Sequence, residues 1–386
     1  MFHKRLQQIA DQSLTRSVRV LESATGPVVQ FGGRPVILLC SNDYLGLAVH
    51  PLVTQAAIRA IEQYGAGSGA SRLICGTLPP HHRLESALAS FKRTESALIF
   101  GSGYLANIGV LPRLIGRDGL ILADRLCHAS LIDGCRLSGA DFRIFRHCDS
   151  MHVESLLKRR TPNRPTLIVT DGLFSMDGDL APLTELASLA ERYDAILYVD
   201  DAHGTGILGA TGRGTLEELG VEDKIPFHMG TLGKAFGSSG AYVVGSRETT
   251  EYLLNTARPF IFATAPPPST AAAALASLDV LQQEPERRAR LWANRHYLFH
   301  GLQRLGFRLT ATVSPILPIL VGDASRALSF AEQMLAHGVY APAIRPPTVP
   351  NHTSRIRVTV TSEHTTSQLD EALRAFEVAG RAAHLI

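Results

Sequence analysis

The feature that most constrains the fold is an alternation of short apolar runs with helix-like segments through the middle of the chain. Runs of strand length occur at residues 97–100, 120–123, 142–145, 167–171, 196–200 and 241–245. Between them, residues 81–92 and 183–193 carry apolar side chains at three- to four-residue spacing, as amphipathic helices do. This alternation predicts an α/β fold with a mostly parallel sheet and helices on both faces.

The pattern changes after residue 282. A helical stretch from Pro285 to Gly306 leads into strand-like and helical segments that read as a compact α+β unit. We expect an N-terminal arm over residues 1–44, a large domain over 45–282 and a smaller α+β C-terminal domain over 283–386. The chain of 386 residues is long enough to form both cores.

The composition disfavours several classes of protein. Lys and Arg number 38 against 35 Asp and Glu, and the resulting charge of +3 is too small to indicate a nucleic-acid surface. Residues 1–22 carry charges throughout and lack the apolar core of a secretory signal. The longest weakly charged stretch, residues 260–278, contains three successive prolines, so we expect no membrane association.

The cysteines give a further indication of class. The chain has five, an odd number, and no two form a CxxC pair. Neither a disulfide framework nor a structural zinc site is indicated, and we expect no bound metal. Together with the charge balance, this favours a cytoplasmic enzyme that acts on small molecules.

Polar residues directly follow several predicted strands, at the edge where open parallel sheets bind ligands. Residues 101–104 (GSGY) form a turn whose backbone N–H groups suit a phosphate, although such a turn is at least as often a plain tight turn. Asp200 and His203 follow the run ILYVD. A metal site there is disfavoured because no further ligand cluster accompanies them, and a capping Asp with a core His is the alternative.

Lys234 stands between glycines in the apolar segment TLGKAFG (231–237). The segment is not a nucleotide-binding P-loop, because Ala235 stands where Ser or Thr is required. A desolvated lysine loses its proton more readily and can form a Schiff base with an aldehyde. The alternative is a surface lysine in a flexible turn.

Two further residues are candidates for ligand binding. His128 follows the run at 120–123 and either stacks on a planar ligand or is structural. Arg345 precedes a proline-rich segment that would hold it in place, which suits capture of a substrate carboxylate. A solvated loop arginine is the alternative.

Taken together, these groups indicate one cofactor. A phosphate-binding turn, a strand-end carboxylate with a nearby imidazole, and a glycine-flanked lysine are what pyridoxal 5'-phosphate (PLP) requires. The chain has no Gly-x-Ser-x-Gly motif, which removes the main support for an α/β-hydrolase. The segment GSGYLA supplies only half of a GxGxxG motif, which disfavours an NAD-dependent dehydrogenase.

Longer runs of the sequence resemble one family, the α-oxoamine synthases, which are fold-type-I PLP-dependent transferases. The matching runs cover nearly the whole chain: SNDYLGLA (41–48), GAGSGASRLICGT (65–77), DRLCHASLIDG (124–134), FSMDGDLAPL (174–183), VDDAHGTGILG (199–209), TLGKAFGSSGAY (231–242) and AIRPPTVP (343–350). The runs at 174–183 and 343–350 look most like the biotin-pathway members. Those enzymes join L-alanine to a pimeloyl thioester of coenzyme A or an acyl carrier protein.

The resemblance implies roles around the cofactor ring. Lys234 would form the Schiff base and then transfer protons. Asp200 would pair with the pyridine nitrogen, and His128 would stack on the ring. His203 and Ser175 would contact the ring hydroxyl.

The resemblance also implies which residues bind the phosphate and the substrate. The phosphate would be held by Thr231 and by the backbone of Gly103 and Tyr104. Thr264 would reach the phosphate of a neighbouring subunit, so a homodimer is implied. The residues implied to bind substrate are Asn42 and Arg345.

Three places depart from the family pattern. Asp171 stands where Glu is frequent, Phe262-Ala263 where a Tyr-Ser pair is common, and ICGT (74–77) is closer to members that acetylate glycine. Glycine C-acetyltransferase or another α-oxoamine synthase is therefore the alternative within the family. A catalytically inactive partner subunit is the alternative from another class, and the presence of Lys234 argues against it.

Overall fold

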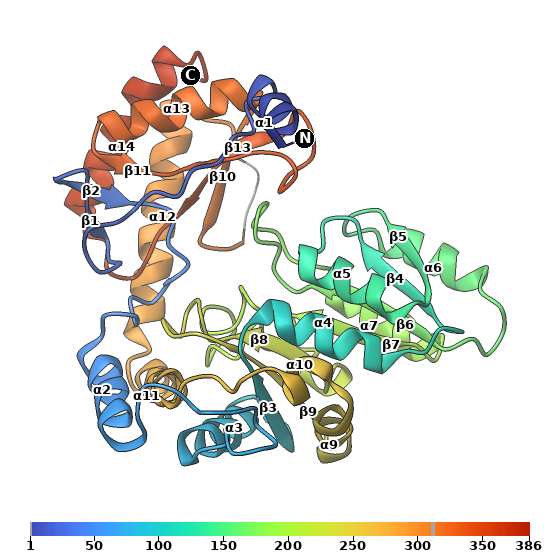
Figure 1. Ribbon diagram of the computed structural model, residues 1–386. Helices are drawn as coiled ribbons and strands as arrows, with labels where there is room; N and C mark the ends of the chain where they lie inside the picture. Colours follow the sequence, from blue (N-terminus) through green and yellow to red (C-terminus); the bar gives the residue numbers. More distant parts are fainter. Residues whose placement is uncertain (1, 310–312) are drawn as a thin grey trace. The chain divides into compact units, whose positions relative to one another are not determined.

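The computed structural model describes residues 2–309 and 313–386. Packing divides the chain into two compact units (Figure 1). The larger unit comprises His50–Ser175 and Leu180–Pro285, and the smaller unit comprises Met1–Val49, Met176–Asp179 and Glu286–Ile386. The domain limits at 44/45 and 282/283 remain predictions.

The larger unit is built on a seven-stranded sheet. Its strands, in spatial order, are β3 (Ser96–Phe100), β9 (Ala241–Gly245), β8 (His228–Thr231), β7 (Ile196–Asp200), β6 (Thr166–Asp171), β4 (Leu120–Asp124) and β5 (Asp141–Phe145). Strands β8, β7, β6, β4 and β5 are parallel, and β9 is antiparallel to both β3 and β8. The predicted, mostly parallel sheet is confirmed. Strand β8 was missed, because HMGT is too polar to stand out.

Both faces of this sheet are covered, which explains its continuous apolar strands. In β4, Ile121 packs into the apolar cluster on one face, whereas Leu120 and Leu122 pack into the cluster on the other. In β7, Tyr198 and Leu197 divide between the two clusters in the same way. Successive side chains of a strand point to opposite faces, so a strand buried on both faces must be apolar throughout.

Helices cover both faces, as the sequence predicts. The first cluster includes residues of α4 (Gly103–Leu114), α5 (Ala129–Ser138), α9 (Arg247–Thr256) and α10 (Arg258–Phe262). The second includes residues of α6 (Ser150–Lys158), α7 (Leu183–Arg192) and α8 (Thr215–Glu218), with the short 3-10 helix Glu222–Lys224 close by in the chain. A separate group, α2 (Pro51–Tyr64), α3 (Pro79–Phe91) and α11 (Pro268–Gln283), packs together (Figure 1).

The three successive prolines of the sequence lie at the start of α11. Pro268 is its first helical residue and Pro267 is its N-cap, positions where the missing proline N–H is not needed. In the part of the chain that the structure describes, no helix is both long and apolar enough to cross a membrane.

The smaller unit is the predicted α+β arrangement. One sheet is antiparallel and contains β10 (Ile316–Gly322), β13 (Ser354–Thr359) and β12 (Ala343–Ile344). A second, mixed sheet contains β1 (Val28–Phe31), β2 (Arg34–Leu38) and β11 (Val339–Tyr340), with β1 antiparallel and β11 parallel to β2. Its helices are α1 (Phe2–Asp11), α12 (Glu286–Leu305), α13 (Ala324–Ala336) and α14 (Thr366–Ala382). Because β11 pairs with β2, the N-terminal segment shares a sheet with the C-terminal segment.

Candidate active site

Two buried carboxylates lie side by side at the carboxyl edge of the large sheet. Asp171 ends β6, Asp200 ends β7, and the two residues are paired in register. Asp200 is 4% exposed and Asp171 is 5% exposed. Burial, and then the negative charge of Asp200, raise the pKa of Asp171 well above its usual range. A cationic group at this edge would therefore be stabilised.

Asp200 is held by a chain of hydrogen bonds from helix α4. The Asn107 Nδ2 donates to Asp200 Oδ2 over 2.7 Å and to Ser130 Oγ over 2.9 Å, while Tyr198 OH donates to Asn107 Oδ1 over 3.0 Å. The backbone N–H of Ala202 donates to Asp200 Oδ1 over 3.0 Å. The carboxylate is thus fixed in one orientation before any ligand binds.

His128 lies beside these carboxylates at the start of α5. Its backbone N–H donates to Asp171 Oδ2 over 2.9 Å, and its ring Nδ1 lies 2.7 Å from Ser130 Oγ. Burial lowers the pKa of His128, and the charge of Lys234 lowers it too, against the opposing effect of Asp200. The neutral imidazole that results is suited to stacking on a flat ring.

The N-terminus of α4 approaches the end of β8 closely. A Cβ on Gly103, the first residue of α4, would lie 2.8 Å from Thr231 Cγ2, so only glycine fits. The N–H groups of Gly103 and Tyr104 belong to the first helical turn, which has no intrahelical acceptors. Thr231, the last residue of β8, adds a hydroxyl. This arrangement is suited to an anion such as a phosphate.

Lys234 lies in the loop between β8 and β9. Backbone bonds from Leu232 N to Gly240 O and from Gly237 N to Lys234 O, at 2.9 and 2.8 Å, close this loop into a compact turn. Gly237 and Gly240 have φ of 58° and 108°, backbone conformations that residues with a Cβ rarely adopt. The half-buried Lys234 is close enough to lower the pKa of both His128 and Asp171 by its charge.

The loop after β7 is fixed by a buried ion pair that the sequence did not suggest. Asp201 is fully buried, and its Oδ2 lies 3.5 Å from Lys92 Nζ. Lys92 Nζ also donates to Thr205 Oγ1 over 2.9 Å, and Thr215 Oγ1 donates to Asp201 Oδ1 over 2.5 Å. These bonds flank His203, which is 7% exposed.

Hydrogen bonds through Asn107 and Ser130 link two of the predicted residues, Asp200 and His128. Gly103 approaches Thr231 closely, and the charge of Lys234 acts on His128. Ser175 is half-buried just after the segment that follows β6. Thr264 is exposed and pairs with Ser71 in an isolated bridge, so it is not part of this group of contacts.

The two residues expected to bind substrate, Asn42 and Arg345, belong to the smaller unit. The Asn42 Oδ1 accepts a hydrogen bond from Arg357 Nη1 over 3.1 Å. The guanidinium of Arg345 donates to the carbonyl oxygens of Ser13 and Thr15 in the N-terminal segment. Burial, and then the nearby charge of Arg16, lower the pKa of Arg345.

Arg345 also borders a cavity of about 430 Å³ within the smaller unit. Arg16 and Arg19 line the same cavity, together with Glu332 and Tyr340. Three guanidinium groups against one carboxylate give this cavity a net positive lining, which suits an anionic group.

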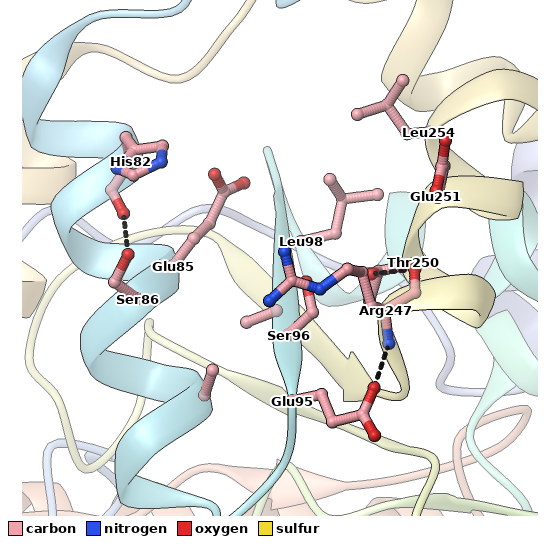
Figure 2. Close-up of a pocket in the computed structure, with 12 residues that line it drawn as sticks. His82, Glu85, Ser86, Glu95, Ser96, Leu98, Arg247, Thr250, Glu251 and Leu254 are labelled. Carbon is pink, nitrogen blue, oxygen red and sulfur yellow. Dashed lines mark hydrogen bonds between the residues drawn. The ribbon is translucent and has the colours of Figure 1, made fainter.

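Another cavity lies away from the predicted residues. It has a volume of about 470 Å³ and is bounded by α3, β3 and α9 (Figure 2). Its lining includes Glu85, Glu95 and Arg247, and none of the residues predicted above. Glu85 is already engaged by Arg72, at 2.9 and 3.0 Å. We therefore assign the site from the arrangement of its ionisable groups and not from this cavity.

Asn107 was not among the residues predicted from the sequence. It lies in the otherwise apolar helix segment around ANIGVL and is fully buried. A buried amide requires hydrogen-bond partners, so a polar residue on the sheet-facing side of this helix was the available signal.

Comparison with known proteins agrees with this geometry. The model of the family "Aminotransferase class I and II" matches residues 34–376. The 8-amino-7-oxononanoate synthase of Anaeromyxobacter dehalogenans (strain 2CP-1 / ATCC BAA-258) is 51% identical, covering 96% of this chain and 93% of the relative. The 8-amino-7-oxononanoate synthase 1 of Bacillus subtilis (strain 168) is 43% identical, covering 99% and 97%.

Solved structures give the same result. Serine palmitoyltransferase from S. paucimobilis with a bound PLP–myriocin aldimine has a TM-score of 0.95 at 35% identity, covering 100% of this chain and 98% of that one. The 8-amino-7-oxononanoate synthase from Francisella tularensis has a TM-score of 0.77 at 28% identity, covering 90% and 99%.

Fold and site together define a fold-type-I PLP-dependent enzyme, which confirms the predicted fold class. The chain belongs to the aminotransferase class I and II family and, within it, to the α-oxoamine synthases.

Proposed function

We propose that this chain is an enzyme of biotin biosynthesis that condenses L-alanine with a pimeloyl thioester, releasing the thiol and CO2, to give 8-amino-7-oxononanoate. The observation that carries the proposal is 51% identity, over 96% of this chain, to an 8-amino-7-oxononanoate synthase. Its chemistry requires PLP, and the residues present are suited to that cofactor.

The fit rests on three features of the larger unit. The buried pair Asp171 and Asp200 suits a cationic pyridine nitrogen, because a positive charge there offsets two adjacent carboxylates. The start of α4 and the Thr231 hydroxyl suit a phosphate. The neutral ring of His128 suits stacking between these points.

When bound, PLP supplies an electron sink that stabilises negative charge at the amino-acid Cα. In this proposal Asp200 holds the proton on the pyridine nitrogen, and Asn107 orients Asp200. Lys234 would hold the cofactor through its Nζ, an amine that can condense with the PLP aldehyde with loss of water, and the same amine would move the proton at the substrate Cα. His128 stacks on the ring.

The remaining predicted residues bind and position. Ser175 and His203 are proposed to contact the ring hydroxyl, and Gly103, Tyr104 and Thr231 to hold the phosphate. Asn42 and Arg345 are proposed to bind substrate, with Arg345 gripping a carboxylate by a charge-assisted fork. These roles are supported by the family motifs that contain these residues.

We also propose that the enzyme is a cytoplasmic homodimer in which Thr264 reaches the phosphate bound by the neighbouring subunit. The exposure of Thr264 supports this assignment, and none of the five cysteines, all within the described residues, forms a disulfide, as in a reducing compartment. The pimeloyl group is proposed to arrive on coenzyme A or on an acyl carrier protein.

The proposal is tested by supplying two substrate pairs to the purified enzyme in parallel. L-alanine with pimeloyl-coenzyme A should release thiol and CO2 in equal amounts and give 8-amino-7-oxononanoate by mass spectrometry. Glycine with acetyl-coenzyme A should react poorly. A clear preference for the second pair would assign the chain to glycine C-acetyltransferase, the activity that the ICGT segment favours.

A further inference from the structure

A second cluster of ionisable side chains lies at the edge of the large sheet, at the ends of β4 and β5. Asp124 is the last residue of β4, and His147 and Cys148 follow shortly after β5. The two strands are parallel, with Asp124 paired to Phe145. The three side chains therefore meet at the carboxyl edge, where sheets of this kind bind ligands. None of the three has a role in the reaction proposed above.

The spacing of these groups is suited to a metal ion. One donor atom from each of Asp124, His147 and Cys148 lies within 4.8 Å of the other two. Asp124 Oδ1 is 2.9 Å from His147 Nδ1, which is 3.7 Å from Cys148 Sγ. With zinc bonds of about 2.0 Å to nitrogen and about 2.3 Å to sulfur, tetrahedral ligand atoms stand about 3.5 Å apart. Small side-chain movements suffice to bring all three onto one ion.

The carboxylate of this cluster is buried and fixed in place. The Asp124 side chain is 1% exposed, whereas that of His147 is 24% exposed. Asp124 Oδ2 accepts from the backbone N–H of Cys148 over 2.8 Å, and Oδ1 accepts from that of Leu126 over 2.8 Å. The innermost group of the cluster is thus the fixed carboxylate of Asp124. Solvent reaches the cluster from the side of the His147 imidazole and the Cys148 thiol.

The backbone brings two successive side chains to one carboxylate. Cys148 has φ of 52°, a left-handed conformation that non-glycine residues seldom adopt. The chain turns there, and the Cys148 sulfur also lies 3.6 Å from the carbonyl oxygen of Leu180. That carbonyl oxygen is a further possible ligand atom for a metal ion beside the three side chains.

We propose that Asp124, His147 and Cys148 form a binding site for a borderline-soft divalent cation, with Zn²⁺ as its representative. A thiolate, an imidazole and a carboxylate are typical zinc ligands, whereas Mg²⁺ and Ca²⁺ require oxygen. Three protein ligands leave one position for water or for the Leu180 carbonyl. Binding releases the thiol proton of Cys148 to solvent, and His147 binds as the neutral imidazole through Nδ1, with its ring proton on Nε2.

The role of the ion is structural. Asp124 anchors the segment that leads to α5: its carbonyl oxygen accepts from Cys127 N over 3.2 Å, and its side chain accepts from Leu126 N. An ion shared with His147 and Cys148 ties this segment to the end of β5. Binding should therefore stabilise the folded protein.

The test uses the purified full-length enzyme with its cofactor, freed of metal by a chelator and dialysed. Zn²⁺ is titrated by calorimetry, Co²⁺ is added as a spectroscopic probe, and Tm is measured with and without Zn²⁺. We expect one equivalent of Zn²⁺, a thiolate-to-cobalt charge-transfer band and a higher Tm.

Two cysteine variants separate this site from adventitious binding. Cys148→Ser should remove the charge-transfer band and weaken Zn²⁺ binding at least tenfold, with an unchanged Tm in the absence of metal. Cys75→Ser, which alters an exposed thiol elsewhere, should bind as the wild type does. If Cys148→Ser fails to fold, His147→Gln takes its place in the same comparison. The proposal would be overturned if the wild type and the Cys148 variant bound Zn²⁺ with equal affinity. It would also be overturned if the Cys75 variant lost as much Zn²⁺ affinity as the Cys148 variant.

Discussion

Asn107 and Asp200 are 93 residues apart in the chain and are joined by a 2.7 Å hydrogen bond from Nδ2 to Oδ2. The bond connects the first turns of α4, where the phosphate is proposed to bind, with the carboxylate proposed to face the pyridine nitrogen. The hydrogen bond thus ties together the two ends of the proposed cofactor site.

Asn107→Ala should loosen Asp200 and leave Tyr198 OH without its acceptor. Because buried polar groups left unpaired cost about 1–3 kcal/mol, the free energy of unfolding should fall by about that amount. Cofactor affinity, measured by fluorescence titration, should fall as well. Asn255→Ala removes an exposed amide and is the matched control. If the Asn107 variant bound the cofactor as tightly as the wild type does, Asn107 would not be needed to orient Asp200.

Asp200→Asn keeps the shape of the side chain but removes its charge. Proton exchange at the Cα of L-alanine, followed by NMR in D2O, should slow by about 10- to 1,000-fold, because an ion pair shifts a pKa by about 1–3 units. Asp223→Asn, at an exposed position, should exchange normally. An unchanged rate in the Asp200 variant contradicts the proposed pairing with the ring nitrogen.

Arg345→Ala should weaken L-alanine binding by about 1.5–3 kcal/mol, or roughly ten- to a hundredfold, through loss of a charge-assisted fork. Cofactor binding should be unaffected. The measurement is a spectral titration with L-alanine, and Arg374→Ala, an exposed arginine of the same unit, is the control. The same substitution also frees the carbonyls of Ser13 and Thr15, so increased proteolysis of the N-terminal segment is expected.

His364 should make the stability of the protein depend on pH. Burial lowers the pKa of His364 to about 4, and its ring Nδ1 accepts from Thr361 N over 3.0 Å. An unfolded histidine has a pKa of about 6.5, so the unfolded state binds the extra proton first. The stabilising effect of the neutral ring is therefore complete above pH 6.5 and is lost as the pH falls towards 4.

The difference in unfolding free energy between wild type and His364→Gln measures this effect. The difference should shrink by about 3 kcal/mol between pH 6.5 and pH 4, since one pKa unit corresponds to about 1.4 kcal/mol. His337→Gln, at an exposed position, should show no such change. A difference that is constant with pH would show that the pKa of His364 is the same in the folded and unfolded states, which contradicts the expected shift.

The sheet and its helices could be predicted from the sequence because a strand buried on both faces is a continuous apolar run, as in β6. Strand β8 is not such a run, because its four residues include His228 and Gly230. Its burial comes from neighbours that are distant in the chain. Site residues could be proposed from the sequence where a motif surrounds each of them, as around Lys234, and their roles stay predictions. Asn107 and the pair Lys92–Asp201 were not, because their roles depend on partners brought close only by folding.

The most direct test of the whole account is the identity of the lysine that bonds to the cofactor. The purified enzyme is reduced with borohydride, digested, and mapped by mass spectrometry, alongside Lys234→Ala and the exposed-site control Lys224→Ala. The account predicts a pyridoxyl group on Lys234 in the wild type and in the Lys224 variant, and none in the Lys234 variant. A pyridoxyl group on another lysine, or a wild-type enzyme that forms no such adduct, would contradict it.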